Sequence, residues 1–306
     1  MEVFYTLLVK LIPLYLIILL GFIASKKLKA QKETISAILI YIIAPVVIFA
    51  GTSQAELNLA ILSLPLVFFL TCCLFCFIFY YFGKYFYPDD STRNILAFTA
   101  GTGNTGYFGL PVTLMLFGEQ AFSIAVLAIL GFILYENTLG FFITARGHHT
   151  ASEALMKVIK LPTIYAFLLG ILVNYLQLDL GLVVQSTVDL FKGAYSVLGM
   201  MIIGMGLAGV SLSYFDKKFL GLSFFAKFII WPLFIFGIIL LDRSYLNFFN
   251  EEIYEVMLLM SIVPLAANTV ALATELKVQP EKAAIAVMLS TMFALIFIPL
   301  VSSIAF

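Results

Sequence analysis

Apolar runs separated by short polar connections make up almost the whole chain. Ten runs follow one another, at residues 4–24, 34–51, 59–82, 94–117, 121–144, 161–177, 185–211, 219–241, 253–274 and 282–304. A helix needs about 20 mostly apolar residues to cross the hydrocarbon layer of a bilayer. The connections are too short to hold a soluble domain. The pattern therefore predicts an all-α polytopic membrane protein with ten transmembrane helices.

Composition agrees with a membrane location. Of the 306 residues, 63% are hydrophobic and 11% are charged, and the mean hydropathy is +1.10. A soluble domain of this length cannot bury so much apolar surface, whereas acyl chains solvate apolar side chains on every outward face. The net charge is zero, so the charge balance gives no indication of a nucleic-acid partner.

Basic residues are distributed unevenly between the connections. When the connections are taken alternately, one set contains or borders thirteen of the 17 basic residues, and the other set holds Arg243 alone. The positive-inside rule places the basic set in the cytoplasm. With an even number of spans, both termini are then expected outside a bacterial cytoplasmic (inner) membrane. The thirteen residues are Lys26, Lys27, Lys29, Lys32, Lys84, Arg93, Arg146, Lys157, Lys160, Lys217, Lys218, Lys277 and Lys282.

Two weak internal repeats divide the chain into halves. Pro13 and Gly21 in the first run have the same spacing as Pro162 and Gly170 in the sixth, and residues 117–126 resemble residues 278–287. Five spans in each half would make the halves enter the membrane from opposite sides, which is a common architecture of secondary transporters. We therefore expect an N-terminal repeat at 1–145, a cytoplasmic linker at 146–160 and an inverted C-terminal repeat at 161–306.

Two spans carry helix-breaking residues near their middles. The fourth contains Gly-Thr-Gly-Asn-Thr-Gly-Tyr-Phe-Gly-Leu-Pro at 101–111, and the ninth contains Ser-Ile-Val-Pro-Leu-Ala-Ala-Asn-Thr at 261–269. The glycines also match a dinucleotide-binding pattern, but the strand and helix that such a site needs are missing. The second repeat places Gly103 opposite Pro264. We expect both helices to be broken there; the alternative is packing glycines and a tolerated kink.

These motifs resemble a known transporter family. Residues 104–111 are similar to the fourth-helix signature of the auxin efflux carrier family, residues 264–275 to its ninth-helix pattern, and residues 136–140 to part of its fifth helix. The resemblance implies a fold like that of the bile-acid sodium symporters, in which helices 4 and 9 cross in a transport domain that moves against a scaffold. Plant members have proline where this chain has Gly103. Bacterial relatives are associated with malate, malonate and similar carboxylates.

The expected crossing suits an anion. The half-helices that begin after Gly103 and Pro264 would point N-termini, each with about half a positive charge and unpaired N–H groups, at the same place. Neighbouring Asn and Thr side chains could supply oriented hydrogen bonds. The candidate binding residues for a small organic anion are Gly103, Asn104, Thr105, Pro264, Asn268 and Thr269.

Charged residues inside the spans are costly and are treated as functional candidates. Lys10 either attracts the anion or extends its ammonium to the membrane surface, and Glu136 either carries a proton, lies beside a cation or neutralises a lysine. Asp189 and Lys192 have the spacing of a structural pair on one helix. Lys227 is interpreted as an internal counter-ion or as a surface-reaching residue.

Other classes of protein have less support. Cys72, Cys73 and Cys76 are interpreted as packing residues because no His, Asp or Glu lies near them to complete a metal site. The hydrolase and zinc-protease motifs are absent, so an intramembrane enzyme is not expected, and no cofactor is implied. A membrane sensor, a structural subunit and a channel stay as alternatives. The resemblance favours a homodimer through helices 2 and 7, and the coupling ion, H⁺ or Na⁺, is undetermined.

Overall fold

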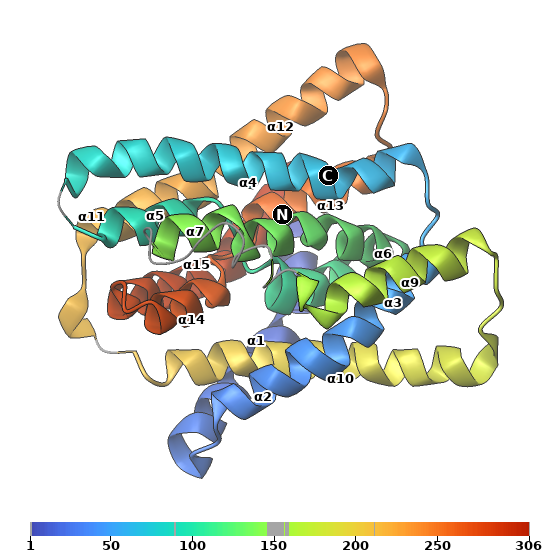
Figure 1. Cartoon of the computed structure of the whole chain (residues 1–306), viewed down its shortest axis with the longest axis horizontal. Coiled ribbons are helices and arrows are strands. Elements are labelled where there is room, and N and C mark those ends of the chain that lie inside the picture. Colours follow the sequence, from blue (N-terminus) through green and yellow to red (C-terminus); the bar gives the residue numbers. More distant parts are fainter. Residues whose placement is uncertain (1, 89, 146–155, 157–158, 211, 306) are drawn as a thin grey trace.

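All regular structure in the described part of the chain is helical. The computed structural model describes residues 2–88, 90–145, 156, 159–210 and 212–305 (Figure 1). None of these residues forms a strand, so the predicted all-α fold class is confirmed. Most of the predicted linker, 146–160, lies outside the described residues.

The first half contains two uninterrupted long helices, a third long helix that bends within its length, and several shorter segments. Its elements are α1 (Glu2–Leu28), α2 (Lys32–Ile38), the π-helical turn η1 (Leu39–Ile43), α3 (Ala44–Gln54), α4 (Leu59–Phe86), α5 (Thr92–Ala100), the π-helical turn η2 (Thr105–Gly109), α6 (Leu110–Asn137) and α7 (Leu139–Ala145). Gly118 in α6 has φ of 85°, a left-handed conformation that glycine adopts readily. The chain therefore bends there, between the fourth and fifth predicted spans.

The second half follows a similar order. Its elements are α9 (Pro162–Tyr175), α10 (Gly181–Leu207), the short turn η3 (Leu212–Tyr214), α11 (Lys217–Phe225), the π-helical turn η4 (Ala226–Ile230), α12 (Trp231–Leu241), the π-helical turn η5 (Asp242–Leu246), α13 (Glu251–Ile262), α14 (Ala267–Glu275) and α15 (Pro280–Ala305). The break between α13 and α14 falls in the ninth predicted span, as the break between α5 and η2 falls in the fourth.

The number of membrane crossings stays a prediction. Seven helical stretches in the described residues are long and apolar enough to span a bilayer, and α13 with α14 forms a further candidate that is bent by 45°. One stretch, 92–145, is 54 residues long and contains the bend at Gly118. The apolar helix α9 has 14 residues, fewer than a straight span needs. Ten crossings result if the long stretch is divided and α9 is included.

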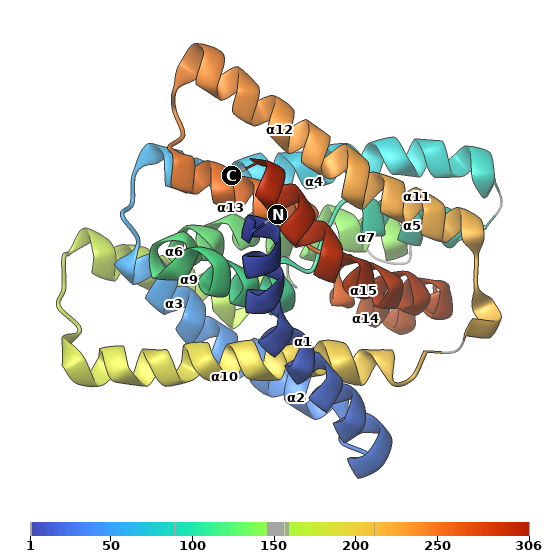
Figure 2. The same cartoon turned by 180° about the vertical axis from the view of Figure 1, so that it is seen from behind.

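The broken helices lie between two sets of unbroken ones. Figures 1 and 2 show α10 along one edge of the molecule with α2 and α3 across it, and α4 and α12 toward the opposite edge. Helix α1 crosses α10 at a very short distance. The approach requires Gly21 and Gly204, since a Cβ atom at either position would overlap the backbone of the facing helix. This contact holds α1 and α10 together as one unit.

A cluster of buried aromatic side chains packs between α4, α6 and α12. The Trp231 ring packs against Phe75 with centroids 4.9 Å apart and against Phe132 with centroids 5.6 Å apart. Phe132 in turn packs on Phe68. Large buried aromatic rings contribute strongly to the stability of a core. The cluster joins α4 and α6 of the first half to α12 of the second.

A polar network joins the two halves at one end of the bundle. Lys282 Nζ lies 3.1 Å from an Asp216 carboxylate oxygen and 3.8 Å from one of Asp90, and the Tyr87 hydroxyl donates to Asp216. Burial raises the pKa of Asp216, but hydrogen bonds from the Phe219 backbone and from Lys282 outweigh it and hold the pKa below its ordinary value. The network therefore ties α4 and α5 to α11 and α15.

Candidate functional site at the two helix breaks

The two broken helices contact each other directly at their breaks. Helix α5 ends at Ala100 and η2 begins at Thr105, while α13 ends at Ile262 and α14 begins at Ala267. The Asn104 backbone N–H donates to the Pro264 carbonyl oxygen at 2.8 Å. The predicted crossing of helices 4 and 9 is therefore present, one residue from the pairing of Gly103 with Pro264 that the repeats suggested.

Local sequence explains where each helix stops. In the second break, Pro264 disfavours the helical conformation of the residue before it, and Val263 is extended with ψ of 154°. In the first break, the glycines have little helix propensity, and Asn104 adopts a non-helical φ of −76° and ψ of 58°. Both interruptions therefore follow from residues within the breaks.

The backbone groups freed by the breaks are bonded mainly by protein. At the end of α5, Trp231 Nε1 donates to the Ala100 carbonyl at 2.7 Å and the Tyr135 hydroxyl donates to that of Phe98 at 3.2 Å. At the end of α13, Lys227 Nζ donates to the Met260 carbonyl at 3.2 Å. Unsatisfied backbone groups are very costly in a membrane interior, and these contacts make the breaks tolerable.

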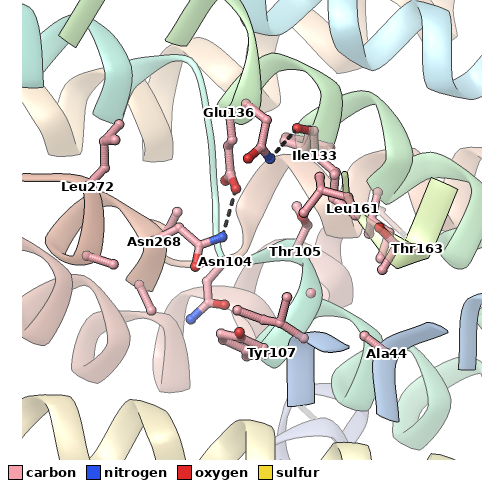
Figure 3. Close-up of a pocket in the computed structure, with 18 of the residues that line it drawn as sticks. Ala44, Asn104, Thr105, Tyr107, Ile133, Glu136, Leu161, Thr163, Asn268 and Leu272 are labelled. Carbon is pink, nitrogen blue, oxygen red and sulfur yellow. Dashed lines mark hydrogen bonds between the residues drawn. The ribbon is translucent and has the colours of Figure 1, made fainter. Parts of the chain in front are cut away.

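A cavity of about 570 Å³ opens beside the crossing. Gly103, Asn104 and Thr105 line it from the first break, and Asn268 lines it from the first turn of α14. Figure 3 shows Asn104, Asn268 and Glu136 grouped at one side of the cavity. Two of the expected residues are absent from the cavity lining: Pro264 contributes a backbone bond only, and Thr269 is fully buried.

Two asparagine residues, Asn104 and Asn268, line the cavity. The whole Asn104 residue is only 4% exposed. Its Nδ2 atom is buried and has no hydrogen-bond partner among the described residues. A buried polar atom without a partner is costly, and it signals a missing group. Asn268 is an exposed residue in the first turn of α14, whose N-cap residue Ala266 provides no side-chain hydrogen bond.

Glu136 connects the two breaks across the cavity. One carboxylate oxygen accepts a hydrogen bond from the Thr102 hydroxyl at 2.6 Å, and the other accepts one from Asn268 Nδ2 at 2.8 Å. Lys10, the other charge singled out in the sequence, is exposed on α1 and does not line the cavity. The structure therefore brings Glu136, but not Lys10, to the crossing.

Lys227 is a residue of the crossing that the sequence analysis did not place there. It is fully buried, its ammonium lies 4.7 Å from the centre of the Trp231 ring, and a Cβ atom on Gly103 would overlap that ammonium. A cation over an indole ring is stabilised by the ring quadrupole. The only signal in the sequence was a lysine inside an apolar run with a tryptophan four residues later.

Lys192 has a closer partner than the one predicted. Asp189 lies 3.8 Å from its ammonium, but Glu119 of α6 lies at 2.6 Å. Lys192 is therefore part of a contact between α10 and the start of the fifth predicted span. Among the cysteines, Cys72 and Cys76 are buried and all three are free thiols.

Two protein-family models match parts of this chain. Residues 6–154 match the family model described as membrane transport protein, and residues 195–306 match that of the sodium bile acid symporter family. The match of the second half agrees with two broken helices that meet at their breaks. The fold and the crossing therefore define a membrane transporter with a bile-acid-symporter-like fold.

Relatives of similar length point the same way. An uncharacterized transporter of Methanocaldococcus jannaschii is 28% identical over 279 residues, which is 88% of each chain. One of Methanothermobacter thermautotrophicus is 24% identical over 94% of this chain and 92% of the relative. The uncharacterized transporter YfdV of Escherichia coli is 23% identical over 88% of each. These matches confirm the resemblance to the auxin efflux carrier family noted in the sequence, and they support a membrane transporter of that kind.

Proposed function

We propose that this chain is a secondary transporter that carries a small organic carboxylate across the cytoplasmic membrane. The anion binds at the crossing of the two broken helices, against Asn104 and Asn268. Alternating access then moves this site from one side of the membrane to the other. Because the exposed Lys160 lines the cavity and its connection is predicted to be cytoplasmic, we assign the opening to the cytoplasmic side.

The observation that carries the proposal is the unpartnered amide of Asn104. Its Nδ2 donor is buried beside a cavity that could hold a small molecule, and a carboxylate oxygen is the acceptor it lacks. The N-terminus of α14 faces the same cavity through Asn268 and adds a partial positive charge. The Lys227 side chain lies directly behind Gly103, and its ammonium adds positive charge within the crossing when it is protonated. Together these groups favour an anion without a dedicated arginine.

Binding is tested first by thermal stability. A ligand that binds only the folded state raises the melting temperature, and the rise grows with the ratio of ligand concentration to its dissociation constant. Purified protein is screened against malate, malonate, succinate, acetate and benzoate, each with and without sodium. At least one of these acids should raise the melting temperature. The matching amides, which lack the charge, should have no effect. Stabilisation by the amides as strong as by the acids would contradict an anion site.

The site is tested by substituting its asparagines. Asn104→Ala and Asn268→Ala each remove one hydrogen bond to a charged group, worth about 1.5–3 kcal/mol, so affinity should fall roughly ten- to a hundredfold. Asn174→Ala is the control with the opposite profile. Asn174 caps the end of α3 through three backbone carbonyls outside the cavity, so its loss should lower stability but leave affinity unchanged.

Transport is separated from sensing by uptake into proteoliposomes. A carrier should accumulate the radiolabelled carboxylate with saturable kinetics, and the asparagine variants should reduce uptake at low concentration. Binding without uptake would indicate a sensor or a structural subunit. Flux that rises linearly with concentration would indicate a channel. Normal affinity and flux in both asparagine variants would place the site elsewhere.

A further inference from the structure

Glu136 is the acidic side chain that lines the cavity among the described residues. It accepts hydrogen bonds from the Thr102 hydroxyl at 2.6 Å and from the Asn268 amide at 2.8 Å. Both donors are neutral. None of the ion pairs within the described part of the chain involves Glu136. The carboxylate is therefore held beside the proposed anion site without a neutralising cation.

The groups around Glu136 do not supply that cation. Lys160, before α9, lines the same cavity but is exposed, and Lys227 of η4 bonds the Met260 carbonyl behind Gly103. The remaining titratable groups are neutral near pH 7. They are Tyr41 of η1, Cys72 of α4, Tyr107 of η2 and Tyr195 of α10.

The immediate partners of Glu136 suit both of its protonation states. A hydroxyl can donate or accept a hydrogen bond. Thr102 therefore donates to the carboxylate when Glu136 is ionised and can accept from the carboxylic acid when Glu136 is protonated. Asn268 can donate to the other oxygen in either state. A proton can consequently arrive or leave without stranding either neighbour.

We propose that Glu136 couples anion transport to a proton. This inference rests on the proposed binding of a carboxylate at Asn104 and Asn268. Because Asn268 already donates to Glu136, a bound anion brings a second carboxylate next to the first, and two adjacent carboxylates do not both stay ionised. Glu136 takes up one proton from solution as the anion binds. The proton travels with the anion and is released on the other side as the anion leaves, so one proton moves with each anion.

The first test measures proton uptake by the wild-type protein. Calorimetric titration with malate, and separately with acetate, is carried out in buffers of different ionisation enthalpy above about pH 6.5, where these acids are ionised. We expect one proton to be taken up per bound anion. The affinity should then fall about tenfold for each unit of rising pH once Glu136 is ionised in the empty site. An affinity that does not vary with pH would overturn the coupling, whatever the variants do.

The second test compares two substitutions. Glu136→Gln keeps an oxygen acceptor and a donor but cannot ionise, so it imitates the protonated state. It should bind malate with little pH dependence and exchange labelled for unlabelled malate across proteoliposomes. It should lose the accumulation that an imposed pH gradient drives in the wild type. Glu255→Gln is the matched control, because Glu255 is a half-buried glutamate of α13 outside the cavity; its pH dependence should resemble that of the wild type.

The outcomes separate the two proposals. If no carboxylate binds the wild type at any pH, the proposed function and the coupling both fail. If carboxylates bind and are transported without proton uptake, or if Glu136→Gln still accumulates malate along a pH gradient, only the coupling fails. Loss of the pH dependence in Glu255→Gln would also contradict the assignment to Glu136. A sodium gradient that replaces the proton gradient in the wild type would identify a different coupling ion.

Discussion

The two helix breaks solve the same problem with different chemistry. In the first break, the carbonyls freed at the end of α5 are bonded by neutral groups, the Trp231 indole and the Tyr135 hydroxyl. In the second, the carbonyl of Met260 at the end of α13 is bonded by the ammonium of Lys227. The first break supplies the unpartnered amide of Asn104, and the second supplies a proline kink and a helix N-terminus. Similar topology therefore does not imply similar roles.

This difference indicates a division of labour. The neutral contacts of the first break fix the backbone, so that Asn104 is held at the cavity. The charged contact of the second break also places a positive charge inside the crossing, where an anion would be attracted. We infer that loss of the neutral contacts of Trp231 and Tyr135 with the end of α5 acts mainly on stability, and that the loss of Lys227 acts mainly on anion binding.

The comparison of the two breaks assumes that the two halves of the chain have opposite orientations in the membrane. Cysteine labelling tests this assumption and has the largest expected effect. Single cysteines at Glu56 and Phe248 should react with an impermeant thiol reagent from outside intact cells. A cysteine at Lys27 should react only after permeabilisation, because the positive-inside rule places it in the cytoplasm. The measurement is all-or-none labelling, and the protein without an added cysteine is the control. External labelling at Lys27 would break the predicted orientation.

Glycine substitutions test the steric difference between residues of the first break. A Cβ atom at Gly101 would overlap the packed Tyr135 ring and approach the Cys72 backbone oxygen to 2.8 Å. Neither can move easily, so Gly101→Ala should destabilise the protein by about 1–3 kcal/mol. At Gly103 the overlap is with the end of the flexible Lys227 side chain and with Val263 at 3.1 Å. Gly103→Ala should therefore cost less stability, measured by thermal unfolding.

Gly101→Ala and Gly103→Ala also separate an effect on packing from an effect on anion binding. Gly103→Ala displaces the Lys227 ammonium, so it should weaken anion binding more than Gly101→Ala does at equal folded fraction. Gly103→Leu should be worse in both respects, because a large side chain would occupy the place where the two backbones meet. Equal stability losses at Gly101 and Gly103 would show that the two positions are sterically equivalent.

Much of the fold was predictable because it depends on local patterns. Apolar runs located the helices, and Gly101–Pro111 and Pro264 located the breaks, since glycine and proline act on their own segments of backbone. The π-helical turn at Leu39–Ile43, which comes just before Pro45, was not predicted. The number of membrane crossings was harder to predict. A hydropathy pattern does not decide whether a short helix such as α9 spans the bilayer or whether the chain turns back at Gly118.

The site was predictable only in part. Asn104, Asn268 and Glu136 were expected because they are polar residues inside apolar spans. The contacts of Lys227 with Met260 and of Lys192 with Glu119 join residues far apart in the chain, and one sequence contains no information on such pairings. Pro264 and Thr269 were also expected to bind the anion, but neither residue lines the cavity.

Replacing the charged contact of the second break should have a selective effect. Lys227→Met keeps the length of the side chain but leaves the Met260 carbonyl without its donor, which costs about 1–3 kcal/mol. Removing a buried charge offsets part of this cost. Stability should change little while carboxylate affinity falls about tenfold or more. Trp231→Phe, the matched change at the first break, should lower stability and leave affinity near that of the wild type.

The reverse result is equally informative. If Trp231→Phe weakens binding as much as Lys227→Met does, the charge at the second break has no special role, and the division between the breaks is wrong. Both variants are compared by thermal unfolding and by titration with malate at one pH.

The smallest expected effect concerns a single hydroxyl beside the second break. Ser290 Oγ of α15 accepts a hydrogen bond from the backbone N–H of Leu265 at 3.1 Å and is fully buried. Ser290→Ala would leave that N–H without a partner in an apolar interior, at a cost of about 1 kcal/mol or somewhat more. Ser302 lies on the same helix, is equally buried, and its hydroxyl has no partner among the described residues.

Ser302→Ala therefore removes a buried hydroxyl that bonds nothing and should leave stability unchanged or slightly higher. The two variants delete the same atom from the same helix, so the difference between their unfolding free energies isolates the bond to Leu265. Because this bond holds the extended backbone that presents Pro264 to Asn104, Ser290→Ala should also weaken malate binding slightly, whereas Ser302→Ala should not. Equal unfolding curves for the two variants would show that the second break is held by the Asn104 contact and Lys227 alone.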